Sequence, residues 1–331
     1  MPDLISSVRR FDRTNIPEDV WVTLRGRDNA ARANVILPHA EKVSSHPEFL
    51  PGSEQFWLVY SEPTTSNIRF ILSCTEGPLG TYPLFIIPVS PVELSLELLQ
   101  GSMEVFCEAL LKDVDFKRQR VFSVFSVEPI AEAFASAWEK IAEVKRINKP
   151  YYDAFFSICT PETFKVCDNP PSVDEVIELR LAVSQDAGKI SELCEEFSNT
   201  SHPFTLSSER ASEEARLLIE NEQVWVCEIE KDGEIDIATI VAATRQSDTV
   251  AAITKVYTPN KWQRQGYAKR LVRRVCRELL MTHEQVVLYV GVSNSAQKLY
   301  QQVGFRAPCK ETPERWLEIG FDRDEVELGH W

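Results

Sequence analysis

The stretch that decides the fold runs from Val256 to Arg274 and reads VYTPNKWQRQGYAKRLVRR. It predicts the end of a strand, then a loop, and then a helix that begins at or just before Gly266. The N-terminus of a helix carries N–H groups without intrahelical partners and about half a positive charge. A glycine there lets a ligand approach the backbone closely. The stretch therefore predicts a site for a phosphate or pyrophosphate.

Charge supports an anion site at this place. The whole chain has 331 residues, 36 basic and 50 acidic, with a formal net charge of −14. The window from Lys255 to Arg277 contains no acidic residue and eight basic ones: Lys255, Lys261, Arg264, Lys269, Arg270, Arg273, Arg274 and Arg277. The remainder of the chain therefore carries −22. Basic helix positions alone are typical of a solvated face, but together with the loop they favour an anion site. The acidic balance argues against a nucleic-acid binder, which gains affinity by neutralising phosphates.

Outward from this stretch, the second half alternates between strands and helices in the order β-α-α-β-β-β-α-β-α-β. The predicted strands are 176–183, 224–230, 235–245, 250–258, 285–291 and 315–321. The predicted helices are 187–198, one that begins at Ser207 or Ser208, 266–281 and 295–303. This order predicts an α/β (α+β) domain in which helices flank a mixed sheet.

The first half predicts a second α/β domain. Its predicted strands are 56–60, 68–74, 83–89, 120–127 and 154–158, and its predicted helices are 29–44 with a break at Pro38, 90–111 with Ser90 as cap, and 130–144. The turn-forming run Asn169–Ser172 marks the boundary. The expected domains are residues 1–170 and 171–331.

Composition also bears on the compartment. The N-terminus lacks the apolar core of a signal peptide, and the longest apolar run, Tyr82–Val89, is far shorter than the roughly 20 residues that a membrane helix needs. None of the eight cysteines forms a C-x-x-C pair, so no zinc ribbon is indicated. We expect a cytoplasmic or nucleocytoplasmic protein without a metal and without a membrane or nucleic-acid partner. Its oligomeric state stays open.

The loop carries a family resemblance. Gln263–Ala268, reading QRQGYA after VYTP, resembles the acetyl-CoA motif [QR]-x-x-G-x-[GA] of the GNAT superfamily of N-acetyltransferases. The resemblance implies acetyl-CoA as co-substrate, with the loop amides on its pyrophosphate and the strand end against its pantetheine arm. The implied cofactor-binding residues are Lys255, Val256, Tyr257, Gln263, Arg264, Gln265, Gly266, Tyr267, Ala268 and Lys269.

A second match lies downstream. Ser293–Phe305, reading SNSAQKLYQQVGF, resembles the N-x-x-A-x-x-L-Y-x-x-x-G-F motif of the same family. Ser293 occupies the usual asparagine position and Asn294 follows it, so both are candidate cofactor contacts. The counterpart of Tyr300 in the family protonates the leaving thiolate, which implies a catalytic acid here. The alternative is a core tyrosine whose hydroxyl is bonded locally.

The resemblance of the second domain covers about residues 175–331. The first half resembles the N-terminal region of two-domain GNAT-like proteins, including a glycine-N-acyltransferase-like subgroup. No Q-x-x-G-x-A occurs in residues 1–170. We therefore expect a degenerate acetyltransferase-like domain that binds no CoA and packs against or shapes the acceptor site.

These features together predict an acyl-CoA-dependent N-acyltransferase, most simply an N-acetyltransferase. A small-molecule amine would attack directly within a ternary complex, with the amide of Val256 stabilising the oxyanion and Tyr300 as the acid. The strand 251–257 contains no carboxylate, so His202, Asp236 and Asp248 are the candidate bases, each with a plainer reading as a loop, solvent-facing or turn residue. The alternatives are a non-catalytic acyl-CoA-binding or regulatory protein and a protein-lysine acetyltransferase.

Overall fold

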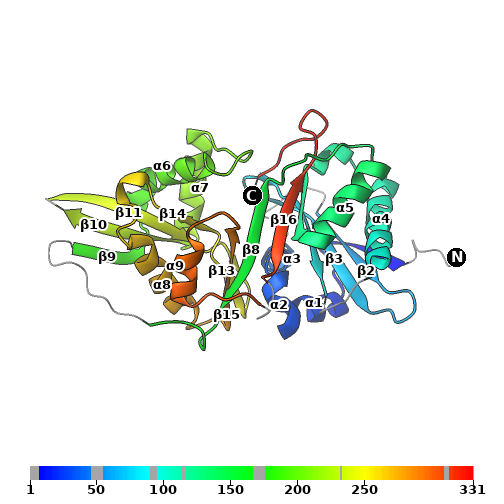
Figure 1. Cartoon of the computed structure of the whole chain (residues 1–331), viewed down its shortest axis with the longest axis horizontal. Helices are drawn as coiled ribbons and strands as arrows, with labels where there is room; N and C mark the ends of the chain where they lie inside the picture. The colour runs from blue at the N-terminus through cyan, green and yellow to red at the C-terminus, as the bar shows by residue number, and fades with distance from the viewer. Residues whose placement is uncertain are drawn as a thin grey trace. The chain divides into compact units, whose positions relative to one another are not determined.

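The computed structural model describes residues 7–45, 55–89, 95–113, 116–166, 176–231, 233–308 and 313–330. The chain divides into two compact units (Figure 1). Unit 1 comprises residues 1–154 together with Glu314–Trp331, and unit 2 comprises Phe155–Pro313. Strand β8 (Tyr152–Cys159) begins in unit 1 and ends in unit 2. The predicted boundary, Asn169–Ser172, lies outside the described residues. Along the chain, the two units divide after Ala154 within β8 and again between Pro313 and Glu314.

Unit 1 is a mixed sheet in the order β1-β2-β3-β6-β7-β16. Its strands are β1 (Val8–Asp12), β2 (Phe56–Ser61), β3 (Ile68–Cys74), β6 (Leu84–Pro88), β7 (Ser123–Val127) and β16 (Arg315–Gly320), with the small pair β4 (Glu76–Gly77) and β5 (Gly80–Thr81) beside it. β6 and β7 are parallel, and the other neighbours in this order pair antiparallel. Successive residues of β2 are buried, which means that both faces of the sheet are covered.

The helices of unit 1 are α1 (Glu18–Arg25), α2 (Arg27–Ala33), α3 (Leu37–Ser45), α4 (Leu96–Lys112) and α5 (Glu128–Ile141). α4 and α5 pack together and enclose one hydrophobic cluster with the strands, in which Phe106, Phe134 and Trp138 are fully buried.

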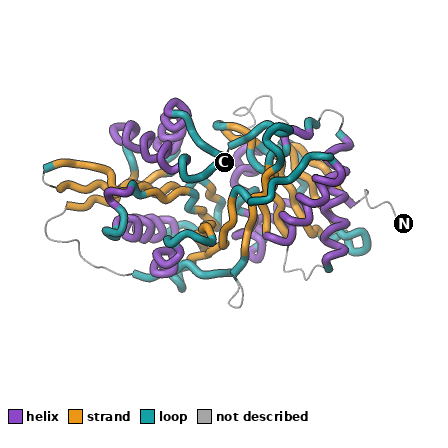
Figure 2. The backbone as a smooth tube through the Cα atoms, turned by 45° about the horizontal axis from the view of Figure 1, so that its top comes forward, coloured by secondary structure: helices purple, strands orange, loops and turns teal. Residues whose placement is uncertain are grey.

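Unit 2 is built around an antiparallel sheet in the order β14-β11-β10-β9, shown in Figure 2 as part of the orange strand set. These strands are β9 (Val176–Leu181), β10 (Val224–Lys231), β11 (Glu234–Ala242) and β14 (Lys255–Tyr257). A second set of strands contains β12 (Arg245–Gln246), β13 (Val250–Ala252) and β15 (Gln285–Gly291). β13 pairs parallel with β15 and antiparallel with β12.

Helices cover both faces of the antiparallel sheet. α6 (Ala187–Ser198) and α7 (Ser208–Glu220) share a hydrophobic cluster with one face, to which Ile240 and Ala242 belong. α8 (Tyr267–Leu279) and α9 (Gln297–Val303) share a cluster with the other face, to which Val241 belongs. The predicted mixed α/β architecture is confirmed. No helix among the described residues is long and apolar enough to cross a membrane.

Several predicted boundaries were wrong. The strand predicted for 250–258 is two strands, β13 and β14, that belong to different sheets. Helix α4 begins at Leu96, because the side chain of Ser95 accepts a hydrogen bond from the N–H of Leu98 and so caps the helix; Ser90 lies outside the described residues. Pro38 does not break a helix but lies in the first turn of α3, where its missing N–H costs nothing.

The last strand, which was predicted within the second domain, pairs with a strand of unit 1. β16 pairs antiparallel with β7 of unit 1, with Trp316 opposite Val127 and Ile319 opposite Val124. The chain therefore returns to unit 1 after building unit 2. Pairing between residues so distant in sequence leaves no local pattern that a sequence analysis can read.

Candidate functional site

The two sheets of unit 2 diverge in the middle of residues 250–257. Ile253 donates its N–H to the carbonyl oxygen of Val287 on β15, at 2.9 Å, whereas Thr254 donates to the carbonyl oxygen of Ala242 on β11, also at 2.9 Å. Lys255 is also opposite Ala242 in the register of β11 and β14. Thr254 and Lys255 thus both lie opposite Ala242, an arrangement called a β-bulge. A bulge changes the direction of the strand that carries it. The bulge sends β14 away from β15.

The backbone of Val256 points to the open edge of its sheet. The N–H of Ala243 bonds the carbonyl oxygen of Gln223 at 2.9 Å. Because successive residues of a strand direct their backbone groups to opposite sides, those of Ala242 face β14, where Lys255 is the partner. The N–H of Val256 must then point away from β11. Since β14 ends the sheet order, this N–H lies at its free edge.

The loop after β14 has two left-handed residues before the helix begins. A short 3-10 turn, Asn260–Trp262, leads to Arg264 with φ of 63° and Gly266 with φ of 88°. Gly266 is the N-cap of α8 and its carbonyl accepts from the N–H of Arg270 at 3.1 Å. A Cβ built on Gly266 would meet no described heavy atom within 4 Å. The loop therefore turns the first amides of α8 toward open space, which suits an anion.

Three predicted contact residues brace this loop with their side chains. Gln263 donates from Nε2 to the carbonyl oxygen of Thr258 and to Oδ1 of Asn260, both at 3.0 Å. Gln265 donates from Nε2 to the carbonyl oxygen of Lys261 at 3.0 Å. Tyr267 is buried, and its hydroxyl donates to Oε1 of Gln265 at 3.3 Å. The side chains of these residues hold the loop, which leaves backbone amides as the groups available to a ligand.

Asp236, a predicted candidate base, instead anchors the loop. Its Oδ2 lies 2.6 Å from Nζ of Lys261 and accepts a 2.8 Å hydrogen bond from Nε1 of Trp262. Nζ of Lys189 lies 3.6 Å from the other oxygen. Burial works to raise the pKa of Asp236, but the hydrogen bonds from Lys261 and Trp262 outweigh it and hold the pKa below its usual value. A carboxylate held in this form is a weak base.

The side chains of Lys255 and Tyr257 lie on the α6–α7 face of the sheet. Nζ of Lys255 lies 2.6 Å from Oε2 of Glu214 on α7, and 5.1 Å from the centre of the Phe197 ring on α6. Tyr257 meets the same ring edge-on, with 6.1 Å between ring centroids. Burial, followed by the Glu196 carboxylate, raises the pKa of Tyr257. The side chain of Lys255 is thus bound in the interior, and its backbone pairs with Ala242 of β11.

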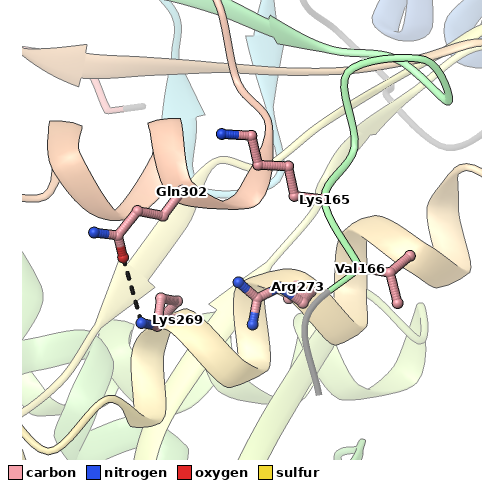
Figure 3. Close-up of a pocket in the computed structure, with 5 residues that line it drawn as sticks. All are labelled: Lys165, Val166, Lys269, Arg273 and Gln302. Carbon is pink, nitrogen blue, oxygen red and sulfur yellow. Dashed lines mark hydrogen bonds between the residues drawn. The ribbon is translucent and has the colours of Figure 1, made fainter. Parts of the chain in front are cut away.

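The basic window is partly neutralised by ion pairs. Besides Lys255 and Lys261, Arg274 pairs with Glu278 at 2.6 Å. Lys269 and Arg273 line a cavity of about 640 Å³ together with Lys165, Val166 and Gln302 (Figure 3).

Tyr300 is buried, with 9% of its surface exposed, in the cluster that also contains Tyr267 and against which Val256 packs. Its ring meets Phe305 edge-on, with 5.8 Å between centroids. The structure thus brings the residue predicted as the acid into one cluster with the loop helix and the free-edge strand.

The two candidate cofactor contacts before α9 differ in their surroundings. Oδ1 of Asn294 accepts a 2.9 Å hydrogen bond from the N–H of Ala296 and so stabilises the start of the helix. Ser293 is exposed. The Asn294 carboxamide oxygen is therefore engaged locally.

The other two candidate bases, Asp248 and His202, are both exposed. Asp248 is exposed in the turn between β12 and β13, where the N–H of Ser247 bonds the carbonyl oxygen of Val250. His202 is exposed in the connection between α6 and α7. Sequence reasoning missed Glu196, the carboxylate beside Tyr257. Its only signal was its position in helix 187–198, which does not reveal the strand that the helix covers.

Within the described ranges, no three or more His, Cys, Asp or Glu side chains gather in a way that could hold a metal ion.

Comparison with known proteins finds a family profile that matches part of unit 2, and solved structures with a similar fold. Residues 220–307 match the profile of the acetyltransferase (GNAT) domain. A GCN5-related N-acetyltransferase from Sphaerobacter thermophilus is similar in structure, with 16% identity and a TM-score of 0.52 over 98% of this chain and 99% of that chain. A Drosophila protein is similar over 95% of this chain and 98% of that chain, with 10% identity and a TM-score of 0.62. No curated protein matches by sequence. At these identities the solved structures show a shared fold, and their alignments extend over both units.

Proposed function

We propose, from the match of residues 220–307 to the acetyltransferase (GNAT) domain, that the chain is an acyl-CoA-dependent N-acyltransferase, most simply an N-acetyltransferase. The observation that carries the proposal is the combination, within unit 2, of a free-edge N–H on Val256 with a left-handed loop at the N-terminus of α8. The first suits the carbonyl oxygen of an acyl group and the second suits a pyrophosphate.

The residues of the loop fit acyl-CoA. The amides at the start of α8, beginning with Tyr267, Ala268 and Lys269, would hold the pyrophosphate, and the free-edge backbone of Val256 would pair with the pantetheine arm. When bound, acyl-CoA supplies an activated acyl group on a thioester. The N–H of Val256 would donate to the acyl oxygen as that oxygen gains charge. The hydroxyl of Tyr300 would give its proton to the leaving thiolate.

Transfer would be direct. The C–N bond to the acceptor amine forms as the C–S bond breaks, the amine loses one proton and the thiolate gains one. Direct attack is supported by Cys194, which belongs to the α6–α7 layer beside Lys255: burial raises its pKa to about 12. A thiol in that state is a poor nucleophile near pH 7.

The acceptor amine would approach from the α6–α7 face, where Tyr257 and Glu196 meet. Glu196 is exposed, so its carboxylate can reach both Tyr257 and a bound amine. We assign it the role of accepting the proton that the amine loses. An acidic acceptor side would also favour cationic amines.

A second candidate function is acyl-CoA binding without catalysis. It is favoured by the surroundings of the carboxylates: Asp236 is held in ion pairs, Asp248 lies in an exposed turn, and residues 251–257 contain no carboxylate. The two functions differ only in whether the thioester is consumed.

One experiment separates the two. Acetyl-CoA binding is measured by calorimetry, and thiol release is then followed with amino acids, polyamines and a lysine-containing peptide as acceptors. We expect binding together with thiol release for at least one amine class, and a Glu196→Gln variant that binds acetyl-CoA as before but loses turnover on the acidic side of its pH profile. The matched control is Glu192→Gln, one turn earlier on α6 and exposed. Binding without thiol release across the panel would establish the non-catalytic function, and no binding would refute both.

A further inference from the structure

A basic cavity lies on the α8–α9 side of unit 2, away from the α6–α7 face. It measures about 640 Å³ and is lined by Lys165, Val166, Lys269, Arg273 and Gln302. Figure 3 shows Lys269 and Arg273 on α8, Gln302 on α9 and Lys165 on a neighbouring segment. Three of its five described lining residues are cationic and none is acidic. The cavity thus offers a concentrated positive potential to an anion.

The cavity adjoins the predicted pyrophosphate loop. Lys269 and Arg273 are four residues apart on α8, so they lie on one face of the helix. At 1.5 Å per residue, Arg273 lies only about 9 Å along the axis from the first residue of the helix. A ligand held by the amides at the start of α8 can therefore extend into the cavity.

The wall that carries Lys165 is fixed by backbone contacts. Lys165 donates its N–H to the carbonyl oxygen of Val303 at 2.9 Å, at the end of α9. Gly304 permits this approach, because a Cβ on it would come within 2.8 Å of Cα of Phe164. The glycine of the predicted G-F motif is thus explained by packing, and its effect is to hold Lys165 over α8.

The hydrogen bond that Lys269 makes at the cavity does not neutralise its positive charge. Its Nζ donates to Oε1 of Gln302 at 3.3 Å, a neutral partner. This differs from Lys255, Lys261 and Arg274, each of which is paired with a carboxylate. Lys269 therefore brings to the cavity a positive charge whose hydrogen-bond partner is neutral.

We propose that this cavity binds the phosphate monoester on the ribose of acyl-CoA, with Lys165, Lys269 and Arg273 as its cationic partners. The inference rests on the proposed function, since it needs the pyrophosphate at the start of α8. A ribose separates that pyrophosphate from the 3′-phosphate, which matches a cationic cavity one to two helical turns from the loop. A monoester near pH 7 carries close to two negative charges, and clustered Lys and Arg are the groups that recognise it.

The test compares binding of CoA and 3′-dephospho-CoA by calorimetry. The protein is expected to bind CoA at least tenfold more tightly than the dephosphorylated form. In Lys165→Ala and in Arg273→Ala, affinity for CoA should fall about tenfold while affinity for dephospho-CoA stays within twofold. The control is Lys298→Ala, an exposed lysine of α9 that does not line the cavity.

The outcomes separate the two proposals. Equal affinity of the unaltered protein for both ligands would overturn the assignment of the cavity and leave the proposed function standing. Equal loss of both affinities in the variants would also overturn it, because the charges would then act on the shared part of the ligand. Binding of neither ligand would refute the proposed function and this inference with it.

Discussion

Nζ of Lys255 lies 2.6 Å from Oε2 of Glu214, with only 9% and 15% of the two side chains exposed. This ion pair joins the strand at the sheet divergence to helix α7. A lysine from the basic window thus serves the interior of the unit, and its neighbour Val256 remains at the free edge. The pair fixes the distance between the edge strand and the helix layer that we assign to the acceptor.

Breaking this pair should be costly. Lys255→Met leaves the Glu214 carboxylate without its partner in a mostly buried position, and we expect a loss of about 3 kcal/mol in the free energy of unfolding. The double variant Lys255→Met with Glu214→Leu should recover most of that loss. Chemical denaturation measures both. The control is Arg216→Met, which breaks an exposed ion pair with Glu220 and should lower the free energy of unfolding by less than about 0.5 kcal/mol. If Lys255→Met lowers it by no more than this control does, the buried ion pair does not stabilise the unit.

Asp236→Asn should loosen the loop. The variant loses the ionic contact to Lys261 and weakens the hydrogen bond from Trp262, so we expect CoA affinity to fall about fivefold, or about 1 kcal/mol. Asp248→Asn, in an exposed turn, should bind CoA as the unaltered protein does. Unchanged affinity in Asp236→Asn would remove Asp236 as the anchor.

The Asp236 carboxylate also makes the stability of the protein depend on pH. Its pKa is lower in the folded than in the unfolded protein, so its stabilising effect is fully present above the unfolded value, near pH 4, and is lost as the pH falls through the folded value. The difference in stability between the unaltered protein and Asp236→Asn should therefore be constant from pH 8 to 5 and shrink below about pH 4. Denaturation curves across this range measure it; a difference that shrinks already between pH 7 and 5 would assign the effect to another group.

Gly266→Glu should abolish CoA binding while the protein stays folded. The substitution forces a non-glycine residue into a left-handed conformation, at a cost of roughly 1–2 kcal/mol, and adds negative charge at the loop. Gly233→Glu is a matched control, because Gly233 also has a positive φ, of 81°, and no described atom within 4 Å of a built Cβ, but lies in the β10–β11 turn. Calorimetry should show binding in the second variant alone. Binding in both would refute the loop as the anion site.

Tyr300→Phe tests the acid. We expect turnover to fall about 100-fold while acetyl-CoA affinity stays within threefold, because only the proton donor is removed. Tyr60→Phe, which removes a buried hydroxyl in the core of unit 1, should leave turnover unchanged. If turnover of Tyr300→Phe stays within twofold, the tyrosine is a packing residue and the proton comes from elsewhere.

Much of the fold could be predicted from local sequence. Helix α6 occupies the predicted residues 187–198, because apolar spacing and the preceding Ser-Gln-Asp turn specify it locally. Ser207 is the N-cap of α7, its side chain accepting from the N–H of Arg210 as short-range capping chemistry requires. The loop 263–268 was identified for the same reason: its glycine and its helix start are properties of consecutive residues.

Other features depended on residues far apart in sequence. Nothing local to Thr254 reveals that its N–H bonds Ala242 while that of Ile253 bonds Val287, yet this divergence frees the edge at Val256. Asp236 alternates with apolar neighbours and was interpreted as facing solvent, but Lys261 and Trp262 reach it from the loop.

By itself, the sequence determined the composition, much of the order of elements and the loop that we assign to an anion, because capping, glycine conformation and apolar periodicity act over a few residues. Only the tertiary structure decided which charges of the basic window remain for a ligand, where the chain leaves and rejoins unit 1, and which carboxylate lies beside Tyr257. Those outcomes follow from long-range strand pairing and from the burial of charges, which no local pattern encodes.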